Sequence, residues 1–398
     1  MSNRERTAMN SELPLRYGCN PYQTPARVFV KKGDLPFFVL NGTPGYINLL
    51  DALNSWQLVK ELKQVLHLPA AASFKHVSPA GAAVGHPLST TLRGASGMED
   101  LDLSPLASAY ARARGADRLS SYGDWVALSD VVDLSTAQLL ACEISDGIIA
   151  PGYEPEALTL LRQKRNGAYV ILQIDPAYEP EETERREVFG ITLEQQRNTI
   201  LPGAHFLEHI PTRNQSFPET AQRDALVALV TLKYTQSNAI ALTYDGQCIG
   251  IGAGQQSRIQ CTRLAATKAA LWYLRQHQRV LDLPWKPGVR RQERVNAIDQ
   301  YLKEDMTPIE QQQWLERFEG VPKMLTAQEK QAWLAGLREV VLGSDGYIPF
   351  QDTIDCAVRS GVSYIVQPGG SLRDQDVVDA CDACEIAMIF SGVRLFHH

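Results

Sequence analysis

The sequence of 398 residues predicts an α/β fold of two lobes, each a mixed sheet flanked by helices, with a small helical insertion. Short apolar runs alternate with helical segments from Leu15 to about Ile174, and this alternation is typical of α/β domains. The same alternation begins again near Glu219 and, after a long polar stretch, resumes at Glu339. With 44% apolar residues, the chain is also long enough to bury more than one core.

The first lobe is expected to cover residues 15–180, after a disordered leader at residues 1–14. Its first elements are a helix at 48–66, whose apolar residues have helical periodicity, and an apolar strand at 70–74. The later elements are a small-residue helix at 106–115 and then, in alternation, strands and helices at 125–128, 136–144, 147–150, 155–164 and 169–172.

The second lobe is expected to cover residues 181–277 and 339–398. The charged, turn-rich stretch 175–200 marks the boundary, and the Gln/Glu/Arg-rich residues 278–338 indicate the helical insertion. The lobe contains a helix at 219–235, strands at 239–242 and 248–251, a helix at 261–274 and a strand at 339–342. Ser145-Asp146-Gly147 recurs as Ser344-Asp345-Gly346, and this echo suggests a duplicated lobe, although three residues alone are weak evidence.

Composition limits the function classes. The formal net charge is −6, and the most basic stretch, 286–294, is better explained as a solvated helix start than as a nucleic-acid track. No apolar run reaches the ~20 residues that span a bilayer, and the N-terminus has no signal-peptide pattern. Seven scattered cysteines fit a reducing compartment. We therefore expect a cytoplasmic protein that binds neither nucleic acid nor membrane.

Lys75 and His76 are the first candidate catalytic residues. An apolar strand delivers the two side chains to a break that Pro79 and Gly81 shape. A proton acceptor beside a fixed positive charge is typical of an active site. A buried structural salt bridge explains the pair about equally well, and the spacing alone does not decide between them.

The glycine-rich stretch 250–258 (Gly-Ile-Gly-Ala-Gly-Gln-Gln-Ser-Arg) has two interpretations. Its backbone N–H groups and Arg258 could hold an anion, or the glycines could form a tight turn that packs on the sheet. The dinucleotide and Walker patterns both fail here. Cys381 and Cys384 form a single CxxC without a second pair of ligands, so no zinc is expected.

Several segments together resemble the AICAR transformylases, the folate-dependent formyltransferases of purine synthesis that form one half of a bifunctional enzyme. The segments that carry the resemblance are 15–21, 39–45, 73–83, 109–118, 145–152, 233–238, 250–258 and 394–398.

The resemblance implies two cytidine-deaminase-like lobes and a homodimer with active sites at its interface. It also implies formyl transfer from 10-formyltetrahydrofolate to AICAR in IMP biosynthesis, which gives FAICAR and tetrahydrofolate. By position, His76 matches the proton acceptor and Lys75 the stabiliser of the transition state. Matches to AICAR-binding positions are Arg16, Tyr17, Gly123, Asp146, Asn238, Arg258, Tyr347 and Arg394. Matches to folate-binding positions are Ile259, Asp352, Ser371 and Leu372. A structural potassium ion near Ser237, Asp345 and His397 is implied as well.

Two departures concern the folate pocket: Leu119 stands where the resemblance leads us to expect Met, and Thr353 where it leads us to expect Asn. The cyclohydrolase half of the bifunctional enzyme has no counterpart before Arg16, so we expect a free-standing transformylase and a separate IMP cyclohydrolase. One alternative is a catalytically silent nucleotide-binding regulatory homologue, and another is a chain that also cyclises FAICAR. A third is an ATP- and formate-dependent formyl ligase, but the sequence contains no recognisable motif for binding the phosphates of ATP.

Overall fold

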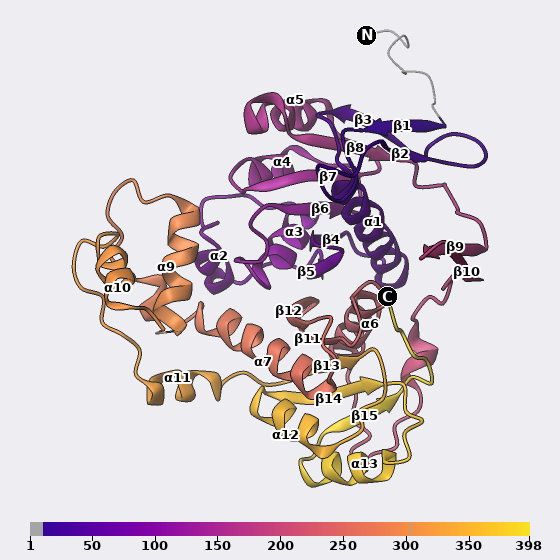
Figure 1. The fold of residues 1–398 in the computed structure, drawn as a ribbon. Helices are drawn as coiled ribbons and strands as arrows, with labels where there is room; N and C mark the ends of the chain where they lie inside the picture. The colour runs from indigo at the N-terminus through magenta and orange to yellow at the C-terminus, as the bar shows by residue number, and fades with distance from the viewer. Residues whose placement is uncertain (1–10, 304) are drawn as a thin grey trace.

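The computed structural model describes residues 11–303 and 305–398. Within them, the centre of the molecule is a mixed sheet of eleven strands in the order β15-β14-β13-β11-β12-β5-β4-β6-β7-β8-β3 (Figure 1). The strands are β3 (Phe37–Asn41), β4 (Ala70–Lys75), β5 (Ser78–Val84), β6 (Asp124–Leu128), β7 (Ser145–Ala150), β8 (Val170–Ile174), β11 (Ile240–Tyr244), β12 (Gln247–Gly252), β13 (Val340–Ser344), β14 (Val362–Gln367) and β15 (Ala387–Phe390). The expected α/β class is confirmed.

Helices cover both faces of this sheet. Along β4, Ala70, Ala72 and Phe74 pack toward α1 and α6, whereas Ala71 packs toward α3, as the alternation of strand side chains requires. The opposite face carries α3, α4 and α5 in the first lobe and α7, α12 and α13 in the second. The helices are α1 (Tyr46–Leu66), α2 (Thr90–Ser96), α3 (Pro105–Gly115), α4 (Leu134–Ala141), α5 (Pro155–Gln163), α6 (Glu219–Lys233), α7 (Arg258–Leu274), α12 (Gln351–Arg359) and α13 (Asp374–Ala383).

The two halves of the sheet repeat one topology. The orders β5-β4-β6-β7-β8 and β12-β11-β13-β14-β15 have the same succession of two antiparallel and two parallel pairings. Each half also has one helix before its hairpin and one between each later pair of strands. The halves join where β5 and β12 meet antiparallel, at Ala83 and Gln247.

The three-residue echo does not align these two halves. Ser145 begins β7, whereas Ser344 ends β13, and the counterpart of β7 is β14. The three repeated residues are therefore not evidence for the repeat, because they begin a strand in the first lobe and end a strand in the second.

Two short hairpins lie outside the central sheet. The first pairs β1 (Glu12–Leu15) with β2 (Ala26–Phe29). The expected disordered leader is thus wrong from Glu12 onward, because Leu13 and Leu15 pack against the core beside α1. Residues 1–10 of that leader lie outside the described residues.

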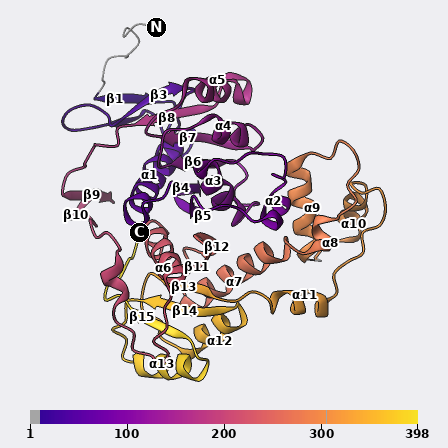
Figure 2. The same ribbon diagram turned by 180° about the vertical axis from the view of Figure 1, so that it is seen from behind.

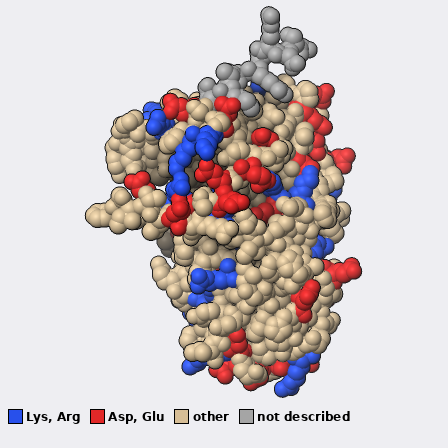
Figure 3. All heavy atoms as spheres, turned by 90° about the vertical axis from the view of Figure 1, so that its right-hand side faces the viewer, with Lys and Arg blue, Asp and Glu red and all other residues tan. Residues whose placement is uncertain are grey.

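The second hairpin pairs β9 (Thr183–Val188) with β10 (Ile191–Gln196), within the stretch expected to be a turn-rich boundary. It projects from the body of the molecule (Figures 1 and 2), and every residue of both strands is exposed. Figure 3 views the side from which this hairpin projects, where side chains of both charges mix above a broad area with few charges.

The stretch from 278 to 334 folds as a group of helices beside α2 and α7 (Figure 2). Tyr301, Trp314 and Phe318 form its own small core. Capping boxes at Thr307 and Thr326 start two of the helices. The helices are α8 (Gln278–Leu281), α9 (Arg291–Lys303), α10 (Pro308–Leu315) and α11 (Ala327–Leu334). Across residues 11–303 and 305–398, no helix combines the length and apolar character needed to cross a membrane.

Candidate active site

Most of the predicted site residues lie along one edge of the central sheet, which we call the site edge. β4 ends there, and β6 and β7 begin there, because β4 is antiparallel to β6 and β6 is parallel to β7. The antiparallel junction of β5 with β12 brings the start of β11 and the ends of β13, β14 and β15 to the same edge. The fold thus gathers side chains from both lobes on one side of the molecule.

His76 and Val77 form the two-residue turn of the β4–β5 hairpin, with φ angles of 53° and 59°. Two left-handed residues in a row are the geometry of a type I′ turn, which favours Asn-Gly, and a β-branched residue there is strained. The turn exposes His76 at the site edge and leaves Lys75 half-buried. The Lys75 ammonium donates to the backbone carbonyl of Tyr122.

Gly123 and Asp146 lie next to this turn. Gly123 has φ of 71°, and a Cβ there would lie 3.8 Å from Oδ1 of Asp146. The Asp146 carboxylate accepts from Nη1 of Arg165 at 3.0 Å. The structure therefore brings together Lys75, His76, Gly123 and Asp146, which we call the lobe-one group.

Buried polar contacts hold the start of β6 in place. The Asp124 carboxylate, which is fully buried, accepts from Oγ of Ser73 at 2.6 Å and from Nη1 of Arg114 at 2.7 Å. Burial raises the pKa of Asp124, and the Arg114 guanidinium opposes this rise. Since Arg114 belongs to α3, these contacts fix α3 to the strand that follows Gly123.

Asp51 and Arg165 contribute to this site and were missed by sequence reasoning. Asp51 lies on α1 among buried apolar residues, and its Oδ1 accepts from the backbone N–H of Val77 at 2.7 Å. An acidic residue on the apolar face of a helix was the signal that could have revealed it. For Arg165, the signal was the Asn-Gly pair that follows it, since residues 165–167 all have positive φ.

Asn238 and Arg258 form the centre of the second group. Arg258 is only 9% exposed, and its Nη2 donates to Oδ1 of Asn238 at 3.1 Å. Its Nη1 donates to the carbonyl of Ala239 at 2.8 Å and to the buried carboxylate of Asp345. The guanidinium is thus committed to protein partners and orients the Asn238 amide. Together with Tyr347 and Arg394, these residues form the lobe-two group.

The residues expected near a potassium ion are tied to one another by hydrogen bonds. Ser237 Oγ donates to Oδ2 of Asp345 at 2.6 Å and accepts from the backbone N–H of His397 at 3.0 Å. The other oxygen of Asp345 accepts from Arg258. Each of these oxygens accepts a hydrogen bond from the protein and keeps a lone pair, so the potassium ion stays a prediction. Among the described residues, no group of three or more His, Cys, Asp or Glu could hold a metal.

The glycines of the 250–258 stretch serve helix–strand packing. A Cβ at Gly250 would lie 2.2 Å from the carbonyl oxygen of Ala265, and one at Gly252 would lie 2.1 Å from that of Cys261. Both oxygens belong to α7, which begins at Arg258. These two glycines therefore lie within β12 rather than in a turn, and their lack of a side chain lets α7 pack closely on the strand. Cys381 is buried and Cys384 exposed on α13, and neither forms a disulfide.

Two residues of the lobe-two group lie at the surface, and the predicted folate residues lie at or near the starts of neighbouring helices. Tyr347 is half exposed, and Arg394 lies with its Cζ 4.6 Å from the Phe396 ring centre. The predicted folate residues lie at the first turns of α7 and α12 and just before α13: Ile259, Asp352, Ser371 and Leu372. Two residues expected to line the folate pocket differ in burial, because Leu119 is half-buried but Thr353 is 1% exposed and belongs to the core side of α12.

Arg16 and Tyr17 follow β1, outside the central sheet. The Arg16 guanidinium lies 5.8 Å from the Tyr17 ring centre. In the described part of the chain, neither side chain forms a hydrogen bond with the other predicted residues. The place of Arg16 and Tyr17 in the AICAR site therefore stays a prediction.

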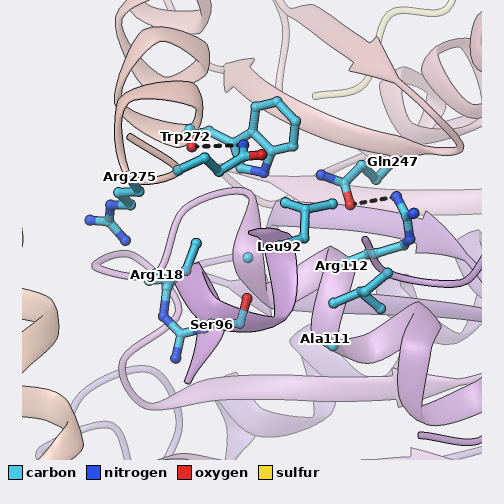
Figure 4. A pocket seen from close by; sticks show the side chains of 12 residues that line it. Leu92, Ser96, Ala111, Arg112, Arg118, Gln247, Trp272 and Arg275 are labelled. Atoms are coloured by element: carbon cyan, nitrogen blue, oxygen red, sulfur yellow. Dashed lines mark hydrogen bonds between the residues drawn. The ribbon is translucent and has the colours of Figure 1, made fainter. Parts of the chain in front are cut away.

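The lobe-one and lobe-two groups also remain apart. The outermost strands of the two groups, β7 and β13, are six steps apart in the sheet, about 29 Å for strands spaced as in ordinary sheets, whereas the β4–β5 turn and the start of β11 are three steps apart, about 14 Å. Two cavities among the described residues lie away from both groups. One of about 20 Å³ lies at the junction of the lobes between Arg112, Arg118, Trp272 and Arg275 (Figure 4), and one of about 480 Å³ lies between β2 and α1.

Comparison with known proteins shows which family the chain is similar to. A family model described as AICARFT/IMPCHase bienzyme matches residues 1–268. The bifunctional purine biosynthesis protein PurH of Elusimicrobium minutum is 29% identical over 388 residues, which cover 96% of this chain and 58% of that protein. The PurH proteins of Sorangium cellulosum (29% identical, 98% of this chain, 60% of the relative) and Xylella fastidiosa (30% identical, 96%, 58%) are similar as well. The chain thus spans less than two thirds of the length of these relatives.

Proposed function

Because the chain belongs to the AICARFT/IMPCHase bienzyme family, we propose that it is an enzyme of purine biosynthesis that formylates AICAR. It transfers the formyl group of 10-formyltetrahydrofolate to the 5-amino group of AICAR and releases FAICAR and tetrahydrofolate. The observation that supports this reaction most directly is the β4–β5 turn, which exposes His76 beside Lys75 at the edge where Gly123 and Asp146 also lie.

The chemistry needs both side chains of this pair. The amine of AICAR is a poor nucleophile, because it is conjugated to an imidazole that carries a carboxamide. Its nitrogen bonds to the formyl carbon, and the excess proton passes to His76, whose imidazole can accept a proton near neutral pH. The Lys75 ammonium stabilises the oxyanion on the formyl oxygen. The bond from that carbon to N10 of the folate then breaks, and N10 takes up a proton as it leaves.

Lys75 has the donors for this role. An ammonium has three N–H donors, and the Tyr122 carbonyl accepts one of them. The remaining donors are available for the oxyanion and for the departing folate nitrogen. The contact with Tyr122 also limits the motion of a long side chain, so less conformational entropy is lost when the transition state forms.

The nucleotide is held by residues of both lobes. Arg258 acts through the Asn238 amide that it orients, whereas Arg394, which is exposed, is suited to the phosphate. The proposed AICAR-binding residues are Arg16, Tyr17, Gly123, Asp146, Asn238, Arg258, Tyr347 and Arg394. The proposed folate-binding residues are Ile259, Asp352, Ser371 and Leu372.

We propose that two copies of the chain share each active site as a homodimer. Asp146 at the start of β7 and Tyr347 after β13 lie six strand spacings apart, about 29 Å, which is too far for one ribonucleotide to contact both within a single chain. The β9–β10 hairpin supports the same proposal, since Phe189 at its tip is 100% exposed and Ile191 and Leu193 are also exposed. An exposed hairpin with three apolar side chains among charged ones is suited to contact a second chain. Burial lowers the pKa of His397, and the charge of Glu184 on β9 opposes this lowering, so the hairpin begins near the C-terminal residues that follow Arg394.

The test is an assay of the purified chain with AICAR and 10-formyltetrahydrofolate. Formation of tetrahydrofolate and FAICAR in equal amounts supports the proposal, and IMP in the same mixture would show that this chain also cyclises FAICAR. Binding of AICAR without turnover would instead support a catalytically silent regulatory homologue. Turnover that requires ATP and formate would support a formyl ligase.

A further inference from the structure

Asp51 lies directly beneath the turn that carries His76. It is 6% exposed, and its Oδ1 accepts from the backbone N–H of Val77 at 2.7 Å. The turn has two consecutive left-handed residues, one of them β-branched, so it persists only because the surrounding structure holds it. The contact from α1 is one such restraint, and it joins the turn to the long helix behind the sheet.

A hydrogen-bond acceptor alone would not require an acid at this position. The amide oxygen of Asn would accept from Val77 equally well, and burial of a carboxylate is costly. This cost is visible in Asp51, because burial raises the pKa of its carboxyl group above its usual value, while the Val77 N–H and the charge of His76 lower it. Unlike an Asn amide, the carboxylate therefore also carries a charge that interacts with His76.

The electrostatic coupling between the two side chains must be mutual. If a protonated His76 favours the ionised form of Asp51, then ionised Asp51 favours the protonated form of His76 by the same free energy. In the proposed reaction, His76 changes from neutral to protonated as the new bond forms. A carboxylate at this position stabilises the product of that proton transfer.

We propose that Asp51 is a positioning residue that holds the His76–Val77 turn and makes His76 a stronger proton acceptor in the formyl transfer. The assignment to catalysis rests on the proposed function, whereas the coupling between the two side chains does not.

Other charges around the turn do not remove this effect. Lys75 at the end of β4 opposes protonation of its neighbour. Asp146 at the start of β7 also acts on Asp51 and raises its pKa, but its own charge is paired with Arg165 at 3.0 Å. Asp51 is thus the buried carboxylate that acts on the His76 side of the turn.

The test replaces Asp51 with Asn, which keeps the size and the acceptor oxygen. In the substrate-free protein, the C2–H proton resonance of His76, identified by its absence in His76→Ala, is followed against pH. We expect the titration midpoint of His76 to fall by about one pH unit. In the assay, kcat should fall about three- to tenfold while KM for AICAR stays within about twofold, because a weaker base slows proton transfer.

Glu61→Gln is the matched control. Glu61 is a second half-buried acid on α1, but it pairs with Lys233 and Tyr234, away from the turn. The control should leave the His76 midpoint unchanged. An unchanged midpoint in Asp51→Asn would overturn the proposed effect on His76, whatever the change in activity.

A measurement on the unaltered protein covers the case in which Asp51→Asn does not fold. The backbone amide resonance of Val77 should shift as Asp51 ionises, above the usual carboxyl value of 3.8, and the His76 resonance should show a second inflection at the same pH. A His76 resonance with one inflection would contradict the coupling. If the coupling is present but no FAICAR forms, the proposed function fails and the coupling stands.

Discussion

Gly81 of β5 lies directly against Ala113 of α3: a Cβ at Gly81 would be 2.0 Å from the Ala113 carbonyl oxygen. The second lobe repeats this contact, with Gly250 of β12 against Ala265 of α7 at 2.2 Å. In both lobes, therefore, a helix that follows the hairpin, α3 or α7, packs so closely on the second strand of the hairpin that the strand has no room for a side chain at that position. The stability of the site edge depends on this packing, since β5 begins at the His76 turn.

Gly81→Ala should destabilise the protein by about 3 kcal/mol, because α3 must move away from β5 to make room for the methyl group. Gly115→Ala is the matched control: it lies at the end of α3 with nothing within 4 Å of the new Cβ, and a helical Ala is favoured over Gly. Urea unfolding measures both. Equal stability of the two variants would contradict the close contact.

Val77→Gly should raise the free energy of unfolding by about 1 kcal/mol, because Gly adopts the left-handed conformation of this turn without strain. Ala80→Gly, in the regular part of β5 where no positive φ is required, should lower it instead. Thermal unfolding of both variants checks the prediction. A loss of stability in Val77→Gly would show that the turn carries no strain that Gly can relieve.

His76→Ala should lower kcat by about 10²- to 10⁴-fold, the usual effect of removing a general base. AICAR binding, measured by calorimetry, should stay near the wild-type value, since the predicted phosphate contacts come from other residues. Arg394→Ala should show the opposite pattern, with KM for AICAR raised more than that for the folate. Near-normal turnover of His76→Ala would remove that residue from the proton transfer.

A mixture of two variants tests the shared site, with AICAR at a concentration far below the raised KM of Arg394→Ala, where each variant alone has little activity. His76→Ala alters the lobe-one group and Arg394→Ala the lobe-two group, so a heterodimer of the two has one unaltered site. Random exchange of subunits should restore about a quarter of the wild-type activity. Two variants of the same group, His76→Ala and Asp146→Ala, should restore none. Restoration in neither mixture would place each site within a single chain.

The ion pair between Asp117 and Lys268 (3.0 Å) should make stability depend on pH. Burial would raise the pKa of Asp117, but Lys268 and Ser120 outweigh it and hold this pKa below its usual 3.8. The ionised carboxylate therefore stabilises the fold above that pH, and its contribution is lost as the pH falls through the lowered value. Asp117→Asn should cost about 1 kcal/mol at neutral pH, and urea unfolding should show a smaller difference from wild type below pH 3.8. A constant difference would contradict this.

The sequence predicted the elements whose pattern is local. The strand expected at residues 70–74 is β4, which extends one residue further, and the helix expected at 48–66 begins two residues earlier as α1. Both have long runs of apolar residues with one clear period. The β9–β10 hairpin was missed because its strands are fully exposed and charged, so the apolar alternation that reveals a strand is weak.

The site was only partly predictable for a related reason. Lys75 and His76 are adjacent in sequence, and the break after the strand reveals them. That Arg258 faces Asp345 across 87 residues of sequence depends on the pairing of β11 with β12 and β13. Asp51 reaches Val77 only because α1 packs behind β4. Long-range pairing of this kind leaves no mark in local periodicity.

The antiparallel meeting of β5 and β12 has a consequence for how such a molecule can diversify. Because it turns one lobe end over end relative to the other, any position inherited by both lobes from a common ancestor faces opposite sides of the molecule. A residue that serves chemistry at one edge of the sheet therefore has its equivalent in the other lobe at the opposite edge, where the same residue type is not needed. Two lobes with the same topology can in this way contribute different residues to one active site.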